Sequence, residues 1–271
     1  MRQVLSIFIL FGILFSGLAK AGSVEASLDA AANGSHRSDK NKARNKFRHP
    51  VQTLSFFGIK DDMTVVEISP GGGGWYTEIL APFLREKGQF YAASFNKDSK
   101  IEYYRKNAQK FLDKLAARPD VYDKVIVTEF EVGAKEKLEP AGQADLVVTF
   151  RNTHNWLNND IAEATFQAMH KVLKKGGTLG LVQHRGTEDM VGKEWSKKGY
   201  VSEREIIRLA EAAGFELVAK SEVNANPKDT KDYEDGVWTL PPVYRLKDQD
   251  RDKYTAIGES DRMTLKFVKP M

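Results

Sequence analysis

The feature that most constrains this chain is the run from Val65 to Thr77, where an apolar segment ends in an acid and then meets four consecutive glycines. The β-branched residues before Glu67 predict a buried strand, and Gly71–Gly74 predict a tight turn. The apolar spacing that follows predicts a helix. A strand, a glycine turn and a helix in this order bring backbone N–H groups and a helix N-terminus against a nucleotide-like ligand.

Strand-like and helix-like segments alternate through the rest of the chain. We expect strands at 64–69, 89–95, 124–130, 144–150, 178–183, 215–223 and 263–268, and helices at 51–59, 75–86, 101–117, 160–174 and 202–213. This alternation predicts an α/β fold with one doubly wound sheet, in which helices cover both faces. The sheet is mostly parallel and gains an antiparallel C-terminal strand. The helix before the fifth strand is expected to stop at Gly176-Gly177.

The N-terminus is typical of a cleaved secretory signal at residues 1–21. Arg2 precedes an apolar stretch over residues 4–18, and Ala19 and Ala21 are the small residues that a signal peptidase inspects. The alternative is an uncleaved anchor, but the apolar stretch is shorter than the ~20 residues of a membrane span. We therefore expect a periplasmic or secreted protein with no stable membrane span after cleavage. The absence of cysteine excludes a lipoprotein anchor, disulfides and thiolate metal sites.

The remaining chain is expected to hold a flexible leader and an N-terminal helix at 22–48, followed by a single domain at 49–271. Within that domain, residues 224–262 differ in composition and are a candidate lid over the ligand site. Loss of Arg2 and Lys20 leaves 39 basic residues of the 41, against 37 acidic ones. This near balance argues against a nucleic-acid partner.

Four ordered blocks resemble the class I, Rossmann-like S-adenosylmethionine (SAM)-dependent methyltransferases. They are the glycine loop at 65–76, the strand at 144–150, the turn and strand at 173–182 and the terminal strand at 263–268. The exported bacterial subgroup of predicted methyltransferases is similar over nearly the whole mature chain, including His49-Pro50 and the segments 151–156, 226–230 and 258–263. The resemblance implies SAM as the cofactor.

The resemblance also implies contacts to that cofactor. Glu67 would face the amino group of the methionine portion of SAM, directly or through water. The backbone at Ser69, Gly71 and Gly73 would lie against the ligand, where a Cβ would crowd it. Gly72 and Tyr76 belong to the same loop and are also candidate cofactor contacts.

Two positions depart from the family pattern. Asn96 stands where the family commonly has an acid that holds the ribose hydroxyls, and an amide can make those hydrogen bonds without charge. The family often has an acid close to the adenine at the position of Gly133-Ala134, and this chain has none at that position. Glu129 and Glu131 are near it in sequence.

The carboxyl end of the fourth strand supplies further candidates. Arg151 and Asn152 could hold a carboxylate of SAM or of the acceptor, and an Arg at this place is as often a structural ion pair. Methyl transfer needs a base only if the acceptor must lose a proton. His154 is the first candidate base and His184 the second, and the alternative is a structural imidazole.

The aromatic residues Trp75, Tyr76 and Trp156 either form walls of the ligand site, where they would also attract a sulfonium, or belong to the core. The histidines show no metal-ligand spacing, so we expect no metal site.

The sequence favours a SAM-dependent methyltransferase that acts on a small-molecule acceptor. The main alternative is an exported, non-catalytic ligand-binding protein that retains the fold, because the export signal removes the chain from cytoplasmic SAM. A nicotinamide-dependent oxidoreductase would need an acid or an Arg about twenty residues past the glycines. Ser94 and Asn96 stand there instead.

Overall fold

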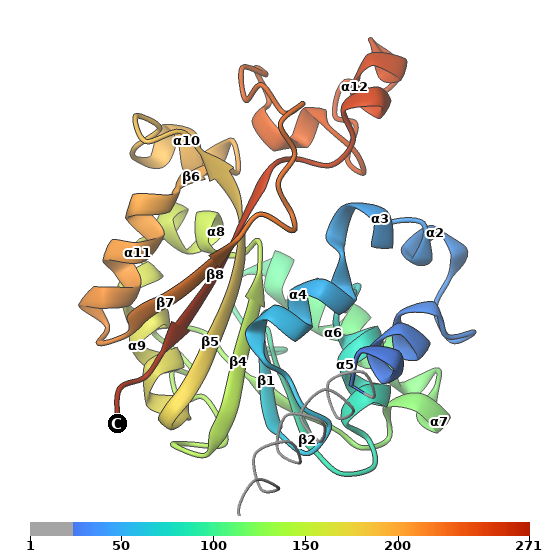
Figure 1. The fold of residues 1–271 in the computed structure, drawn as a ribbon, viewed down its shortest axis with the longest axis vertical. Coiled ribbons are helices and arrows are strands. Elements are labelled where there is room, and N and C mark those ends of the chain that lie inside the picture. Colours follow the sequence, from blue (N-terminus) through green and yellow to red (C-terminus); the bar gives the residue numbers. More distant parts are fainter. Residues whose placement is uncertain (1–23) are drawn as a thin grey trace, which may run out of the picture.

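The computed structural model describes residues 24–271, so the predicted signal at 1–21 lies outside the described residues. Eight strands form the sheet in this range (Figure 1). They are β1 (Thr64–Ile68), β2 (Gln89–Ser94), β3 (Val125–Glu129), β4 (Ala144–Phe150), β5 (Leu173–Gly186), β6 (Val201–Ser202), β7 (Glu216–Ser221) and β8 (Arg262–Val268).

The strand order is β3-β2-β1-β4-β5-β8-β7, with β6 paired to β5. All pairings among β1–β6 are parallel, whereas β8 runs antiparallel between β5 and β7. This arrangement confirms the predicted mostly parallel, doubly wound sheet with an antiparallel C-terminal strand. The chain leaves β1 toward β2 on one side and returns to β4 on the other, and ligands bind at such a switch point, beyond the carboxyl ends of the strands.

Helices cover both faces of the sheet (Figure 1). They are α2 (Asp39–Lys42), α3 (Asn45–Arg48), α4 (Pro50–Phe57), α5 (Thr77–Leu84), α6 (Glu102–Ala116), α7 (Pro119–Tyr122), α8 (Thr153–Asn158), α9 (Ala162–Val172), α10 (Lys193–Lys197), α11 (Glu203–Ala212) and α12 (Arg251–Ile257), with a 3₁₀ helix η1 (Gly236–Thr239). One apolar core lies under α8, α9 and α11, and a second lies under α4, α5, α6 and the N-terminal residues. No helix within residues 24–271 is long and apolar enough to cross a bilayer.

The described part of the predicted flexible leader is ordered instead. Residues 24–33 are helical, and Leu28 is fully buried in the second core. Arg37, further along, donates from Nε to Glu78 Oε2 at 3.0 Å in a buried ion pair. The sequence suggested a leader because most of these residues are small and polar. Ala31 and Ala32 are small enough to pack closely beside Leu28, so few apolar residues suffice.

The turn before the fifth strand also differs from the prediction. The helix α9 ends at Val172, and β5 already begins at Leu173 rather than after Gly176-Gly177. The buried Leu173 pairs with Ala144, and a register shift lies between this pair and the next, Leu146 with Thr178. The two glycines therefore lie within an irregular strand start instead of ending the helix.

Residues 224–262 lie at the carboxyl end of the sheet, beside α3 (Figure 1). Their own small core contains Tyr233, Leu240 and Tyr254. The segment is joined to the end of β5 where the backbone N–H of Arg185 donates to the carbonyl of Asp261 at 3.0 Å. It therefore lies where a lid over the ligand edge would have to lie.

Candidate functional site

The glycines in the loop between β1 and α5 have two different environments. Gly72 and Gly74 face α6, since a Cβ on Gly72 would lie 2.9 Å from Asn107 Oδ1 and one on Gly74 would lie 2.9 Å from the Phe111 ring. A Cβ on Gly71 or Gly73 would meet no other described residue within 4 Å. Gly72 and Gly74 are thus explained by packing, and the space beside Gly71 and Gly73 is available to a ligand.

Glu67 lies at the end of β1 beneath this loop and is 3 % exposed. Its Oε2 accepts a hydrogen bond from the Thr77 hydroxyl at 2.6 Å. Burial raises the pKa of Glu67 to about 7, although the Thr77 hydrogen bond and the charge of Arg151 act in the opposite direction. A cationic ammonium group brought beside this carboxyl would favour its ionised form.

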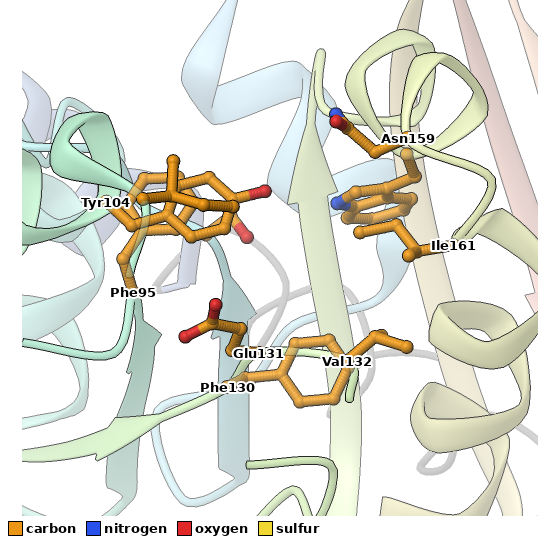
Figure 2. A pocket seen from close by; sticks show the side chains of 10 residues that line it. Phe95, Tyr104, Phe130, Glu131, Val132, Asn159 and Ile161 are labelled. Carbon is orange, nitrogen blue, oxygen red and sulfur yellow. The ribbon is translucent and has the colours of Figure 1, made fainter. Parts of the chain in front are cut away.

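A cavity of about 190 Å³ opens at the carboxyl ends of the strands, next to Ser69 (Figure 2). Its lining residues are Ser69, Phe95, Ile101, Tyr104, Phe130, Glu131, Val132, Trp156, Asn159 and Ile161. Figure 2 shows Phe95 and Tyr104 facing Asn159 and Ile161 across the space. Pockets for whole ligands usually measure about 300–1,000 Å³, so this cavity is sized for one part of a ligand whose remainder extends along the loop.

One wall of the cavity is aromatic, and an acid stands beside it. The rings of Phe95 and Tyr104 stack 4.6 Å apart at 7°. Glu131, two residues after the end of β3, accepts hydrogen bonds from Asn96 Nδ2 and Ser99 Oγ, each at 2.8 Å. Sequence reasoning placed Asn96 at the ribose, whereas Asn96 holds Glu131 and is not among the lining residues. Phe95 and Tyr104 were missed, and Glu131 was noted near the adenine position but not chosen, although it immediately follows the strand predicted at 124–130.

Three other candidates make contacts within the protein. The Nδ2 of Asn152 donates to the carbonyls of Ile68 and Ser69 at 3.1 and 3.2 Å, so this side chain supports the loop. Tyr76 is buried, stacks on Phe150 at 3.4 Å, and donates from its hydroxyl to a carbonyl of α3. Trp75 lies under the guanidinium groups of two arginines. Of the three predicted aromatic walls, only Trp156 lines the cavity.

His154 is held as a hydrogen-bond donor. Gln183 Nε2 donates to the Gly199 carbonyl at 2.9 Å, which fixes the orientation of the amide, and also reaches His154 Nδ1 at 3.1 Å. The Nδ1 must then accept, so the ring proton is on Nε2, which is buried and has no partner in the part of the chain that the structure describes. Burial lowers the pKa of His154 to about 4. Neither nitrogen of this neutral tautomer is free to take a proton.

His184 has a different environment. Its Nδ1 lies 2.5 Å from Ser260 Oγ, and its Nε2 makes no hydrogen bond within the described chain. The ring lies 5.7 Å from that of His154 and 6.3 Å from the partly exposed Trp238 of η1. Burial, followed by the neighbouring His154, lowers the pKa of His184 well below its usual value, so the ring is neutral.

Arginines from distant parts of the chain gather beside the histidines, and we call Arg44, Arg48, Arg151 and Arg262 the arginine cluster. Glu259 accepts from Arg44 Nε at 2.6 Å, from Arg48 Nε at 3.3 Å and from Arg262 Nη2. Arg151 directly follows β4 with a left-handed backbone, φ = +61°. Burial and the charge of Arg262 lower the pKa of Arg151 to about 10.

The residues whose types suit metal ligands do not gather in this way. Within residues 24–271, no three of them are placed to hold a metal ion.

Comparison with known proteins identifies the family. The family model for the methyltransferase domain matches residues 40–220, and no curated protein sequence matches the chain. Among solved structures, a SAM-dependent methyltransferase from Aquifex aeolicus is 17 % identical with a TM-score of 0.51, covering 90 % of this chain and 98 % of that one. The [4+2]-cyclase SpnF is 12 % identical with a TM-score of 0.59, covering 95 % and 96 %.

A putative sarcosine dimethylglycine methyltransferase from Galdieria sulphuraria is 11 % identical with a TM-score of 0.52, covering 84 % of this chain and 86 % of that one. At these identities the structural likeness establishes the fold. The family match spans well over half of the chain and includes the glycine loop, the cavity and most of the strands. The chain therefore belongs to the methyltransferase domain family.

Proposed function

We propose that this protein is a SAM-dependent methyltransferase that acts on a small-molecule acceptor. The observation that carries the proposal is the cavity beside Ser69, at the carboxyl ends of the central strands, with an aromatic wall and one acid. Membership of the methyltransferase domain family supports the reaction class. The SAM-dependent enzyme from Aquifex aeolicus, which has the same fold, supports the choice of cofactor.

The residues present fit such a cofactor. The apolar, aromatic-walled cavity suits a flat nucleoside base, and Glu131 offers carboxylate oxygens to hydroxyl or amino groups. Gly71 and Gly73 have open space beside them in the loop that starts at Ser69 of the cavity, and the nearby Glu67 carboxyl suits an ammonium group. In this proposal the adenosyl part occupies the cavity and the amino-acid part lies along the loop.

SAM, when bound, supplies a methyl group on a sulfonium sulfur that is already activated for transfer. The protein's task is then to align the acceptor and, for an acceptor that must lose a proton, to take that proton. His184 suits the second task if Nδ1–H donates to Ser260 Oγ, because Nε2 then carries the lone pair. His154 suits a positioning role, since its Nε2–H can only donate. The proposed order of the two histidines is thus the reverse of the order expected from sequence.

Export by residues 1–21 is a further part of the proposal, and it would place the chain with the exported bacterial subgroup that its sequence resembles. The basic start, the apolar stretch and the Ala19-Lys20-Ala21 site support it. Mass spectrometry of the protein recovered from a periplasmic fraction tests it. A mature N-terminus at Gly22 is expected, and an intact Met1 in the cytoplasmic fraction alone would contradict it.

Titration calorimetry with SAM and S-adenosylhomocysteine tests the proposed cofactor site. Val132 lines the cavity, so Val132→Trp should fill it and abolish binding. Val218 is 51 % exposed on the edge strand β7, so Val218→Trp is a matched control that should bind like the wild type. Folded wild-type protein that binds neither compound would refute the proposed function.

A further inference from the structure

The arginine cluster carries more positive charge than its contacts within the protein neutralise. Within residues 24–271, Glu259 is the one carboxylate that pairs with these four guanidinium groups. Four positive charges and one negative charge leave this group with a net charge of +3. Burying like charges together is costly, and folded proteins rarely do so without a partner group.

The cluster also contains buried donors without an acceptor among residues 24–271. Arg48 is 4 % exposed and Arg262 is 2 % exposed, yet Arg48 Nη1 and Arg262 Nε have no hydrogen-bond partner in this range. The guanidinium of Arg48 lies 4.6 Å from the centre of the Trp75 ring, which fixes it in place but accepts no hydrogen bond. Unpaired buried donors are exceptions that call for an explanation, such as a ligand.

Arg151 is the member of the cluster that is free to meet a ligand. Its side chain is partly exposed, and it has no hydrogen-bond or ion-pair partner in the described part of the chain. Its backbone is held by a 2.6 Å hydrogen bond to the Val182 carbonyl. Arg151 does not line the cavity beside Ser69. Its charged neighbours are Arg262 at the start of β8, Glu259 between α12 and β8, Arg44 just before α3, and Glu67 in β1.

We propose that the methyl acceptor is an anion, and that the guanidinium of Arg151 binds its carboxylate or phosphate group within the field of Arg48 and Arg262. This inference rests on the proposed function and adds the chemical class of the substrate. The charge of Arg151 acts on His184, whose ring lies 6.3 Å from that of Trp238. In this proposal the acceptor's acid group meets Arg151 while its reacting atom meets His184. A planar guanidinium binds either acid group through two parallel hydrogen bonds.

Calorimetry on the full mature chain saturated with S-adenosylhomocysteine tests this site, with benzoate and phenyl phosphate as anionic probes and benzyl alcohol as the neutral probe. At least one anion should bind, and the alcohol should bind at least about ten-fold more weakly. Arg151→Gln should weaken the anion by at least about ten-fold while changing the affinity for S-adenosylhomocysteine by less than about three-fold. Arg118→Gln, which removes an exposed pair with Asp120, is the matched control and should leave both unchanged.

Thermal unfolding separates this role from a structural one. Because Arg151 lacks a partner among like charges, Arg151→Gln should keep or raise the Tm, whereas a structural arginine would lower it. Equal binding of the three probes, or anion binding that survives Arg151→Gln, would overturn the proposal. Loss of S-adenosylhomocysteine binding in that variant would also overturn it, by assigning Arg151 to the cofactor. If the wild type binds no S-adenosylhomocysteine, the proposed function fails, and the anion titration of the unsaturated protein still decides this inference.

Discussion

Glu259 joins three parts of the fold, and its removal should be among the most destabilising polar changes in the protein. The carboxylate is 4 % exposed and accepts from Arg44 and Arg48 on the N-terminal side and from Arg262 at the start of β8. In Glu259→Gln the side chain keeps its size but loses its charge. Its amide NH₂ then faces guanidinium donors that cannot accept a hydrogen bond.

The magnitude follows from the burial of the pair. Breaking a buried ion pair by removing one partner costs about 3–5 kcal/mol, because the other charge is left uncompensated. For a chain of this size, each 1 kcal/mol shifts the Tm by about 2–4 °C. We therefore expect Glu259→Gln to lower the Tm by about 6–20 °C at pH 7.

The effect should shrink in acid. Burial opposes ionisation of Glu259, but the charges of Arg262 and Arg48 outweigh it and hold the pKa of this carboxyl well below its usual range. A depressed folded pKa stabilises the fold above the unfolded value of about 4.3 and loses that contribution as the pH falls below it. The wild type and Glu259→Gln should thus differ most near pH 7, and the difference should shrink steadily as the pH falls below about 4.3 toward the depressed folded pKa.

Thermal unfolding followed by circular dichroism over this pH range measures both effects. Asp39→Asn removes a carboxylate whose side chain is 99 % exposed and paired with Lys42, so it serves as the matched control and should leave the Tm unchanged. A shift below about 3 °C for Glu259→Gln at pH 7, or an equal shift at pH 3, would refute the reasoning.

Three further changes test other parts of the account. Burial raises the pKa of Glu67 to about 7, so the wild type loses stability as the pH rises from about 4.3 to 7. The Tm of Glu67→Gln relative to that of the wild type should therefore increase from pH 4 to pH 8, and no increase would contradict this. Gly73→Ala should keep the Tm but weaken the binding of S-adenosylhomocysteine measured by calorimetry. Gly74→Ala should lower the Tm, because the new Cβ would be strained at φ = +50° and would contact the Phe111 ring. The reverse pattern would be contrary evidence. Leu28→Ala should lower the free energy of unfolding in urea by about 2–5 kcal/mol, and a change near zero would support the flexible leader predicted from sequence.

Much of the fold was predictable because its signals are local. The strands β1 and β4 are apolar runs between turn residues, and the loop at Gly71–Gly74 shows the turn directly. The order of these elements was enough to predict a parallel sheet with two covered faces. The start of β5 was not predictable, because Leu173 is placed by its pairing with Ala144, which the sequence near Leu173 does not reveal.

The candidate site was less predictable because most of its contacts join distant residues. Glu131 reaches the cavity wall through hydrogen bonds from Asn96 and Ser99, more than thirty positions away. The arginine cluster joins Arg48 to Glu259 across 211 positions. Strand-end positions indicated which residues lie at the ligand edge, but not which of them face a ligand and which support the loop.

The central claim is that the cavity beside Ser69 holds the adenosyl part of SAM, and a crystal structure of the complex with S-adenosylhomocysteine tests it most directly. The account predicts the adenine ring between the Phe95–Tyr104 wall and Ile161, with Glu131 within hydrogen-bond distance of the nucleoside. The amino-acid part should lie along Gly71 and Gly73. Density for the nucleoside at any other place, with this cavity left to solvent, would contradict the account.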